Sequence, residues 1–217
     1  LGMYGDPATG GLNKADFLER QELYRQAEVL SMQDVPHFIA KSWSIYACRN
    51  FINDASGSLC EIAEPKDPND PVIRPLIDTS LLLYIRGDAD TEEALKERAR
   101  SHPKPLFYNP LFIGPRLENQ PDDGAGVDMI DFARPLFPEL MEFRKPRYRD
   151  MAERFGVSVE AADLFGPNAN RTPTADEFLE VLHGALAREV NDNPHGAEML
   201  ERYLVACAKR EGRAPSL

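Results

Sequence analysis

The sequence predicts an α/β protein with a helical C-terminal extension. Helix-like and strand-like segments alternate up to about residue 165, and two helix-like segments then close the chain. The run at residues 80–85 has the length of a strand and is almost wholly apolar, which is typical of a parallel strand buried on both faces. We therefore expect a parallel-sheet core over residues 1–168 and a helical extension over residues 169–217.

The first part of the chain favours two helices followed by a strand. Asn13 can cap a helix that continues to about residue 30, and Pro36 can open a second helix. Residues 50–54 then form a short strand candidate that ends in Asp54, and a turn of small residues follows it.

The middle of the chain predicts a strand, a helix, a long loop and a last strand. The strand at residues 80–85 is followed by a helix whose acidic start and basic end suit the helix dipole. Residues 102–126 are rich in Pro and Gly, so we expect a loop or lid rather than a core element, anchored at 106–113 and mobile at 115–126. A helix starting at Pro146 leads to a strand at 157–159. The three strand candidates are predicted to lie in one parallel sheet.

The extension has a clear helix start. Thr174 and Glu177 stand at the spacing of a capping box, and apolar residues follow at helical intervals. A final helix completes the chain.

Composition narrows the possible function classes. The formal net charge of −11 argues against a general nucleic-acid binder, which normally presents a basic face. No apolar run approaches the roughly 18–20 residues of a membrane span. The three cysteines form neither an evident disulfide framework nor a zinc-binding pair, so a reducing cytoplasm is the expected location.

Asp54 is the first candidate functional residue. A carboxylate at the end of a buried parallel strand would lie at the sheet edge where open α/β sheets bind ligands, and it could orient Mg²⁺ beside nucleotide phosphates. Ser56, Gly57 and Ser58 would form the adjoining turn. The alternative is that Asp54 only caps that turn.

Two groups of cations are candidate phosphate contacts. Arg98 and Lys104 flank the start of the expected lid, where cations could neutralise charge on a transferred phosphoryl group. Arg144 and Arg147 lie at the predicted start of the helix before the last strand, and a helix N-terminus with flanking arginines binds anions well. The alternative for both groups is an exposed helix face balanced by nearby acids.

Several segments together resemble a bacterial family of P-loop ATPases of unassigned role. The matching motifs are a Gly-Asp-Pro-Ala…Gly-Gly loop at residues 5–11, Arg-Gln at 20–21, Ala-Glu at 27–28, Asp-x-Ser-Gly-Ser-x-Cys-Glu at 54–61, Pro-Lys-Pro-x-x-Tyr at 103–108 and Arg-x-Pro-Arg-Tyr at 144–148. The family is distantly similar to small-molecule kinases of the shikimate-kinase and zeta-toxin type. The resemblance covers roughly residues 1–165.

This resemblance implies a P-loop kinase-like core that binds ATP with Mg²⁺ and acts as an ATPase or on an unknown small-molecule or protein substrate. The phosphate-binding pattern GxxxxGK[S/T] occurs nowhere in the sequence, and the family's counterpart would precede Leu1. The alternative is a non-catalytic kinase-like fold that serves as an interaction or assembly module.

Overall fold

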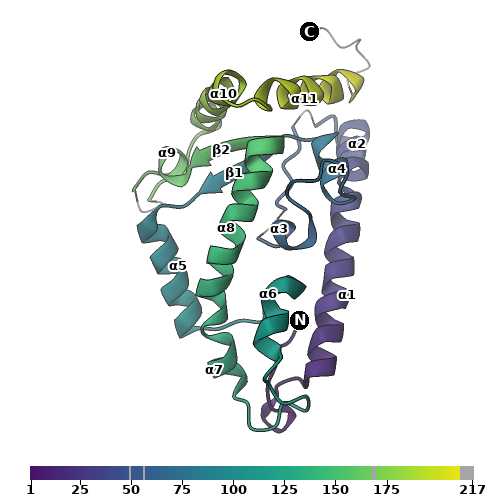
Figure 1. The fold of residues 1–217 in the computed structure, drawn as a ribbon. Coiled ribbons are helices and arrows are strands. Elements are labelled where there is room, and N and C mark those ends of the chain that lie inside the picture. The colour runs from purple at the N-terminus through teal and green to yellow at the C-terminus, as the bar shows by residue number, and fades with distance from the viewer. Residues whose placement is uncertain (49, 56, 168–169, 211–217) are drawn as a thin grey trace.

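A computed structural model describes residues 1–48, 50–55, 57–167 and 170–210, and Figure 1 shows their arrangement. The structure is a mixed α/β fold that is mostly helical, with a small parallel sheet. The helices are α1 (Lys14–Gln33), α2 (Val35–Tyr46), α3 (Leu59–Ile62), α4 (Ile73–Ile77), α5 (Ala89–Ser101), α6 (Pro110–Leu117), α7 (Met129–Ala133), α8 (Leu136–Phe155), α9 (Ala161–Phe165), α10 (Ala175–Asp192) and α11 (Gly196–Arg210), and a 3₁₀ turn, Pro7–Thr9, precedes them.

The parallel sheet consists of β1 (Leu82–Arg86) and β2 (Gly156–Glu160). Leu83 pairs with Val157 and Ile85 with Val159, so the predicted strands at 80–85 and 157–159 are confirmed as parallel neighbours. Val157 and Val159 of β2 are fully buried, but β1 is only partly buried and Ile85 is 40% exposed, so the prediction that the strand at 80–85 is buried on both faces is wrong.

The predicted strand at residues 50–54 is wrong. These residues have no strand partner in the described structure, and the Ile52 side chain is 87% exposed. Ala47 ends α2 in the left-handed region, at φ 52°, and the chain after it runs along the surface. Two adjacent apolar residues bury too little surface to hold an unpaired segment in a sheet. Asp54 therefore does not follow a buried strand.

A proline separates α1 from α2. Pro36 has no N–H to donate to Met32, and its ring crowds the carbonyl of that residue, which bends a helix. Asp34 lies between the two helices with φ −81° and ψ −12°, close to helical values, and its N–H still donates to the Leu30 carbonyl. Helices α1 and α2 therefore follow each other nearly continuously, with a bend at residues 34–36.

Helix α8 is the central element of the molecule (Figure 1). It packs against both strands and against α3, α5, α7 and α11. The sequence predicted that a helix begins at Pro146, but α8 runs unbroken from Leu136 through that proline. The buried residues Leu140 and Met151 lie on either side of it, so packing maintains the helix through a position that propensity disfavours.

The core comprises three clusters of buried side chains. The first joins α1 and α2 to α4 and the end of α8, and the second joins α1 to α6 and the start of α8. The third contains Val157, Val159, Leu164, Ala185 and Met199, so the C-terminal helices α10 and α11 pack on β2 and α9. The predicted capping box forms, with the Glu177 N–H donating to Thr174 Oγ1 at 3.3 Å and the Thr174 N–H to Glu177 Oε2 at 2.8 Å.

The prediction of a loop instead of a core element at residues 102–126 is wrong, the expected anchoring of residues 106–113 agrees with the burial of most of their large side chains, and the expected mobility of residues 115–126 stays a prediction. The segment contains α6, and its large apolar side chains Phe107, Tyr108, Phe112, Ile113 and Leu117 are buried. Pro110 at the first helical turn and the Asn109 cap explain how a Pro-rich segment starts a helix.

The rest of this segment, residues 118–128, packs on the N-terminal loop. Tyr4 Oη donates to the Pro121 carbonyl at 2.6 Å, and the Lys14 N–H donates to the Asp122 carbonyl at 2.9 Å. Gly124 sits in the left-handed region at φ 73°, where a Cβ would collide with the Gly5 carbonyl. The two loops therefore approach each other backbone to backbone.

We expect Gly124→Ala to lower the free energy of unfolding by at least about 2 kcal/mol, because it adds a collision to left-handed strain that itself costs on the order of 1 kcal/mol. Gly126→Ala is the matched control: Gly126 has the same φ of 73°, but its Cβ would meet nothing within 4 Å. Urea titration of both variants measures the difference. Equal losses would show that the loops can separate without cost.

None of the helices in the described part of the chain combines the length and apolar content that a membrane crossing requires.

Candidate functional site

The motif residues from the middle of the sequence meet beside α3. Tyr148 Oη donates to the Gly57 carbonyl at 2.6 Å, and Ser58 Oγ donates to Glu28 Oε2 at 3.1 Å. A Cβ on Gly57 would lie 2.9 Å from Nη1 of Arg144, so the turn lies directly on that guanidinium and a larger residue would displace it. Gly57, Ser58 and Arg144 were predicted as site residues, and the structure brings them together.

A buried ion pair lies below this turn. The Glu61 side chain has no exposed surface, and it accepts hydrogen bonds from Nη2 of Arg144 and, at 2.6 Å, from the Asn109 N–H. Asn109 Nδ2 donates in turn to the Glu61 carbonyl at 2.7 Å. Burial raises the pKa of Glu61 to about 6, although Arg144 acts in the opposite direction. The Arg144 guanidinium and the Asn109 N–H both favour the ionised carboxylate, so Glu61 and Arg144 form an ion pair inside the protein.

Arg147 holds the other end of α3. Its Nε donates to the Cys60 carbonyl at 2.6 Å and its Nη2 to the Ala63 carbonyl at 2.8 Å. Carbonyls at a helix C-terminus lack partners within the helix, and a guanidinium here satisfies two of them. Both predicted anion-binding arginines, Arg144 and Arg147, thus donate to groups within the protein.

Gln21 connects this network to the segment before α6. Its side chain accepts from the Tyr108 N–H at 2.9 Å and donates to the Leu106 carbonyl at 3.0 Å. The network therefore ties α1, α3, α8 and residues 106–109 together by groups that are mostly buried. Its chemistry is that of an internal polar network that fixes these elements relative to one another.

The remaining predicted site residues lie elsewhere. Arg98 on α5, Lys104 after α5 and Asp54 before α3 are all exposed. Within the described residues, no hydrogen bond or ion pair joins Arg98 or Lys104 to the network around Glu61. Ser56 lies outside the described residues.

A second location has the shape of a ligand site. A hollow of about 120 Å³ lies at the carboxyl end of β1 and is lined by Tyr84, Arg86, Gly87, Glu92, Lys145 and Arg149. We call it the β1-end hollow. The carboxyl edge of parallel strands is where open α/β sheets place their ligands. Its volume is several times the roughly 10–15 Å³ that a single water needs, which is enough for a phosphate-sized group.

The cations of the β1-end hollow differ in how they are paired. Arg86 forms an ion pair with Glu160 at 2.6 Å, and Lys145 forms ion pairs with Glu92 at 2.5 Å and Glu142 at 3.0 Å. The hydrogen bond to Glu92 raises the pKa of Lys145, so this ammonium stays charged. Arg149 has no hydrogen bond or ion pair with any described residue. It is the cation whose guanidinium is available to an incoming anion.

Tyr84 forms one wall of the β1-end hollow, and its ring packs on that of Tyr148. The rings of Tyr84 and Tyr148 stack with their centroids 5.3 Å apart and their planes 18° apart. Tyr148 also donates to Gly57, so it links the hollow to the network around Glu61.

The described residues include no group of three or more His, Cys, Asp or Glu side chains arranged to hold a metal ion. Mg²⁺ needs fewer protein ligands, because it usually keeps several waters and binds one or two carboxylates together with phosphate oxygens. Glu92 is the carboxylate that lines the β1-end hollow and could fill this role.

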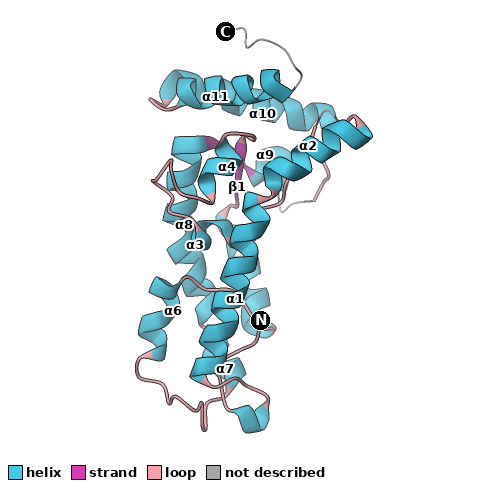
Figure 2. Cartoon of the chain, turned by 90° about the vertical axis from the view of Figure 1, so that its right-hand side faces the viewer, coloured by secondary structure: helices cyan, strands magenta, loops and turns pink. Residues whose placement is uncertain are grey.

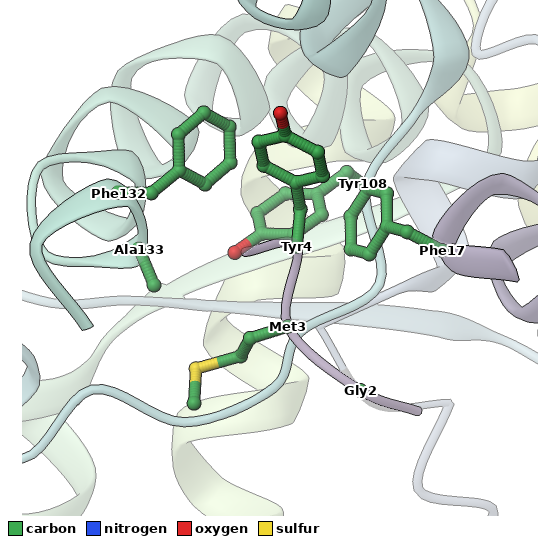
Figure 3. A pocket seen from close by; sticks show the side chains of 7 residues that line it. All are labelled: Gly2, Met3, Tyr4, Phe17, Tyr108, Phe132 and Ala133. Atoms are coloured by element: carbon green, nitrogen blue, oxygen red, sulfur yellow. The ribbon is translucent and has the colours of Figure 1, made fainter. Parts of the chain in front are cut away.

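A further cavity lies between the N-terminal segment and α7 (Figure 3). It is lined by Gly2, Met3, Tyr4, Phe17, Tyr108, Phe132 and Ala133, and its volume of about 10 Å³ has room for one water at most. It is a packing gap among aromatic rings and cannot receive a nucleotide.

Sequence reasoning missed most of the β1-end hollow. Its signal was the strand at 82–86 followed by Gly87 and then by Asp88, which caps α5 by accepting from the Thr91 N–H. A strand, a glycine and a helix cap in succession are typical of a ligand-binding edge in α/β proteins. Arg149 could have been singled out because it lies one helical turn from Lys145.

No protein-family model matches the chain, and comparison with curated proteins and with solved structures finds no significant match. The family resemblance of the motifs therefore stays a prediction, and the functional argument rests on the geometry of the site.

Proposed function

We propose that this protein binds ATP with Mg²⁺ and acts as a P-loop-type ATPase or phosphotransferase, with a phosphate group held in the β1-end hollow. The observation that carries the proposal is the position of a cation-lined hollow of about 120 Å³ at the carboxyl end of a parallel strand. Three of its lining residues, Arg86, Lys145 and Arg149, are cations in a chain of net charge −11.

The three cations would have different tasks. Arg149 can turn its guanidinium to a phosphate without breaking an existing ion pair, and the planar fork of arginine suits two phosphate oxygens. Lys145 and Arg86 are positioned by their carboxylate partners and would add positive potential. Glu92 would coordinate Mg²⁺ bound to the same phosphate. The cation would also reduce the electrostatic repulsion between the carboxylate and the phosphate.

The affinity should be weak for this chain, because a P-loop supplies most phosphate contacts through backbone N–H groups and a lysine, and the sequence has no GxxxxGK[S/T] pattern. A dissociation constant on the order of 0.1–1 mM corresponds to roughly 4–5.5 kcal/mol. Nuclear magnetic resonance titration can measure a dissociation constant in this range, and the amide resonance of Gly87 should shift as ATP and Mg²⁺ are added.

Arg149→Glu should weaken this binding by at least about tenfold, because it removes a charge-assisted hydrogen bond and places a like charge beside the phosphate. Arg98→Glu is the matched control: it makes the same charge change at an exposed position that does not line the hollow. If Arg98→Glu abolishes binding and Arg149→Glu does not, the phosphate site predicted from the sequence is correct and the β1-end hollow is not the site.

A non-catalytic interaction module is the second candidate. It is favoured by Arg144 and Arg147, which donate to Glu61 and to the α3 carbonyls and so act within the fold. ATP at 5 mM with Mg²⁺ distinguishes the two functions. A titration that shifts no resonance around Gly87 would support the module.

A further inference from the structure

Exposed apolar side chains follow one face of α1 and α2. They are Leu23, Ala27 and Leu30 on α1, with Phe38 and Ile45 on α2, and we call this set the outer stripe. Leu23 is 58% exposed and Leu30 61% exposed. Figure 2 shows α1 and α2 running along the side of the molecule that faces the viewer.

The outer stripe is continuous in helical phase. Steps of four and three residues separate Leu23, Ala27 and Leu30, which places them on one face of α1. Because Asp34 has nearly helical dihedral angles, the phase continues through the bend, and Phe38 and Ile45 follow on the same face. Single exposed apolar residues are ordinary, but a row of them bordered by polar residues marks an interaction surface.

We propose that a second copy of this chain packs on the outer stripe, with the two α1 helices antiparallel and crossing at Ala27. The small Ala27 side chain lets the two backbones approach, and Leu23 of each copy then packs near Leu30 of the other. A helix of 20 residues is about 30 Å long, so the contact can extend over several turns.

Charge complementarity favours a second copy of the chain as the partner and an antiparallel arrangement of the two α1 helices. Arg20 and Asp34 lie seven residues to either side of Ala27, so an antiparallel pair places Arg20 of one copy opposite Asp34 of the other. Neither side chain forms an ion pair within the described residues, and Asp34 makes no side-chain cap at the start of α2. Two-fold symmetry repeats the contact, giving two Arg20–Asp34 pairs around the apolar centre. A parallel pair would instead place like charges together.

Size-exclusion chromatography coupled to light scattering, run on the 217-residue chain, tests this proposal. We expect a dimer mass at about 50 µM, and a monomer for Leu30→Glu with an unchanged far-ultraviolet circular dichroism spectrum. The dimer dissociation constant should rise by more than about tenfold, because the change buries a carboxylate within the apolar contact. Leu111→Glu is the matched control, since Leu111 is 77% exposed on α6 and outside the stripe, and it should stay dimeric.

Charge reversal tests the register. Arg20→Asp and Asp34→Arg should each weaken the dimer about tenfold or more, and the two together should restore it, because the double change exchanges the members of each pair. A wild-type chain that is monomeric at 50 µM would overturn the proposal. A dimer that neither charge reversal nor Leu30→Glu affects would overturn it as well.

Discussion

Glu61→Ala should lower the free energy of unfolding by about 3–5 kcal/mol, since removing one member of a buried ion pair leaves the other charge buried and uncompensated. Glu61 has no exposed side-chain surface, and Arg144 would lose its carboxylate partner while still covered by Gly57. The Asn109 N–H would lose its acceptor too. Chemical denaturation monitored by circular dichroism measures the loss.

Two further variants separate charge from packing at this position. Glu61→Gln keeps an acceptor for the Asn109 N–H but removes the charge. It should therefore lower the free energy of unfolding, but by less than Glu61→Ala does. Glu64→Ala removes an exposed glutamate three residues away and should change stability by less than about 0.5 kcal/mol. Equal small losses for Glu61→Ala and Glu64→Ala would show that the pair with Arg144 contributes nothing to stability.

Leu140→Ala should lower the free energy of unfolding by about 2–5 kcal/mol, through lost apolar burial and the cavity left behind. Leu140 is fully buried on α8, in the cluster that also contains Tyr4, Phe17 and Phe112. This cluster draws residues from the N-terminal loop, α1 and α6, so a cavity here loosens contacts among segments far apart in sequence.

The matched control for this change is Leu111→Ala, which removes the same atoms from a mostly exposed leucine and should cost less than about 0.5 kcal/mol. Thermal unfolding compares the two variants directly. A Leu140→Ala melting temperature equal to that of Leu111→Ala would mean that the surrounding helices close the cavity without cost.

The parts of the fold that were predictable are those encoded by nearby residues. The apolar run before Arg86 predicted β1, and Thr174 with Glu177 predicted the start of α10. Each depends on residues within a few positions of one another. The parallel pairing of β1 with β2 could also be predicted, because the helices between them provide the crossover that parallel strands need.

Features that depend on distant partners were not predictable. Arg144 and Arg147 looked like an anion site because their partners are 83 and 87 residues away in sequence and belong to α3. Residues 50–54 looked like a strand because the sequence does not reveal that their apolar side chains lack a surface to cover. Pro and Gly in 102–126 signalled breaks, but Phe112 and Ile113 make the segment part of the core.

The pairing of Glu61 with Arg144 joins two segments that leave the ribosome at different times. Ribosomes add about 5–20 residues per second, so the carboxylate waits roughly 4–17 s for a partner 83 positions later. Until α8 has emerged, the helices α1 and α3 have neither this ion pair nor the buried face that α8 supplies to both of their clusters. The nascent first half therefore exposes apolar surface for seconds, and it is the stage at which a chaperone that binds apolar segments would act on this chain.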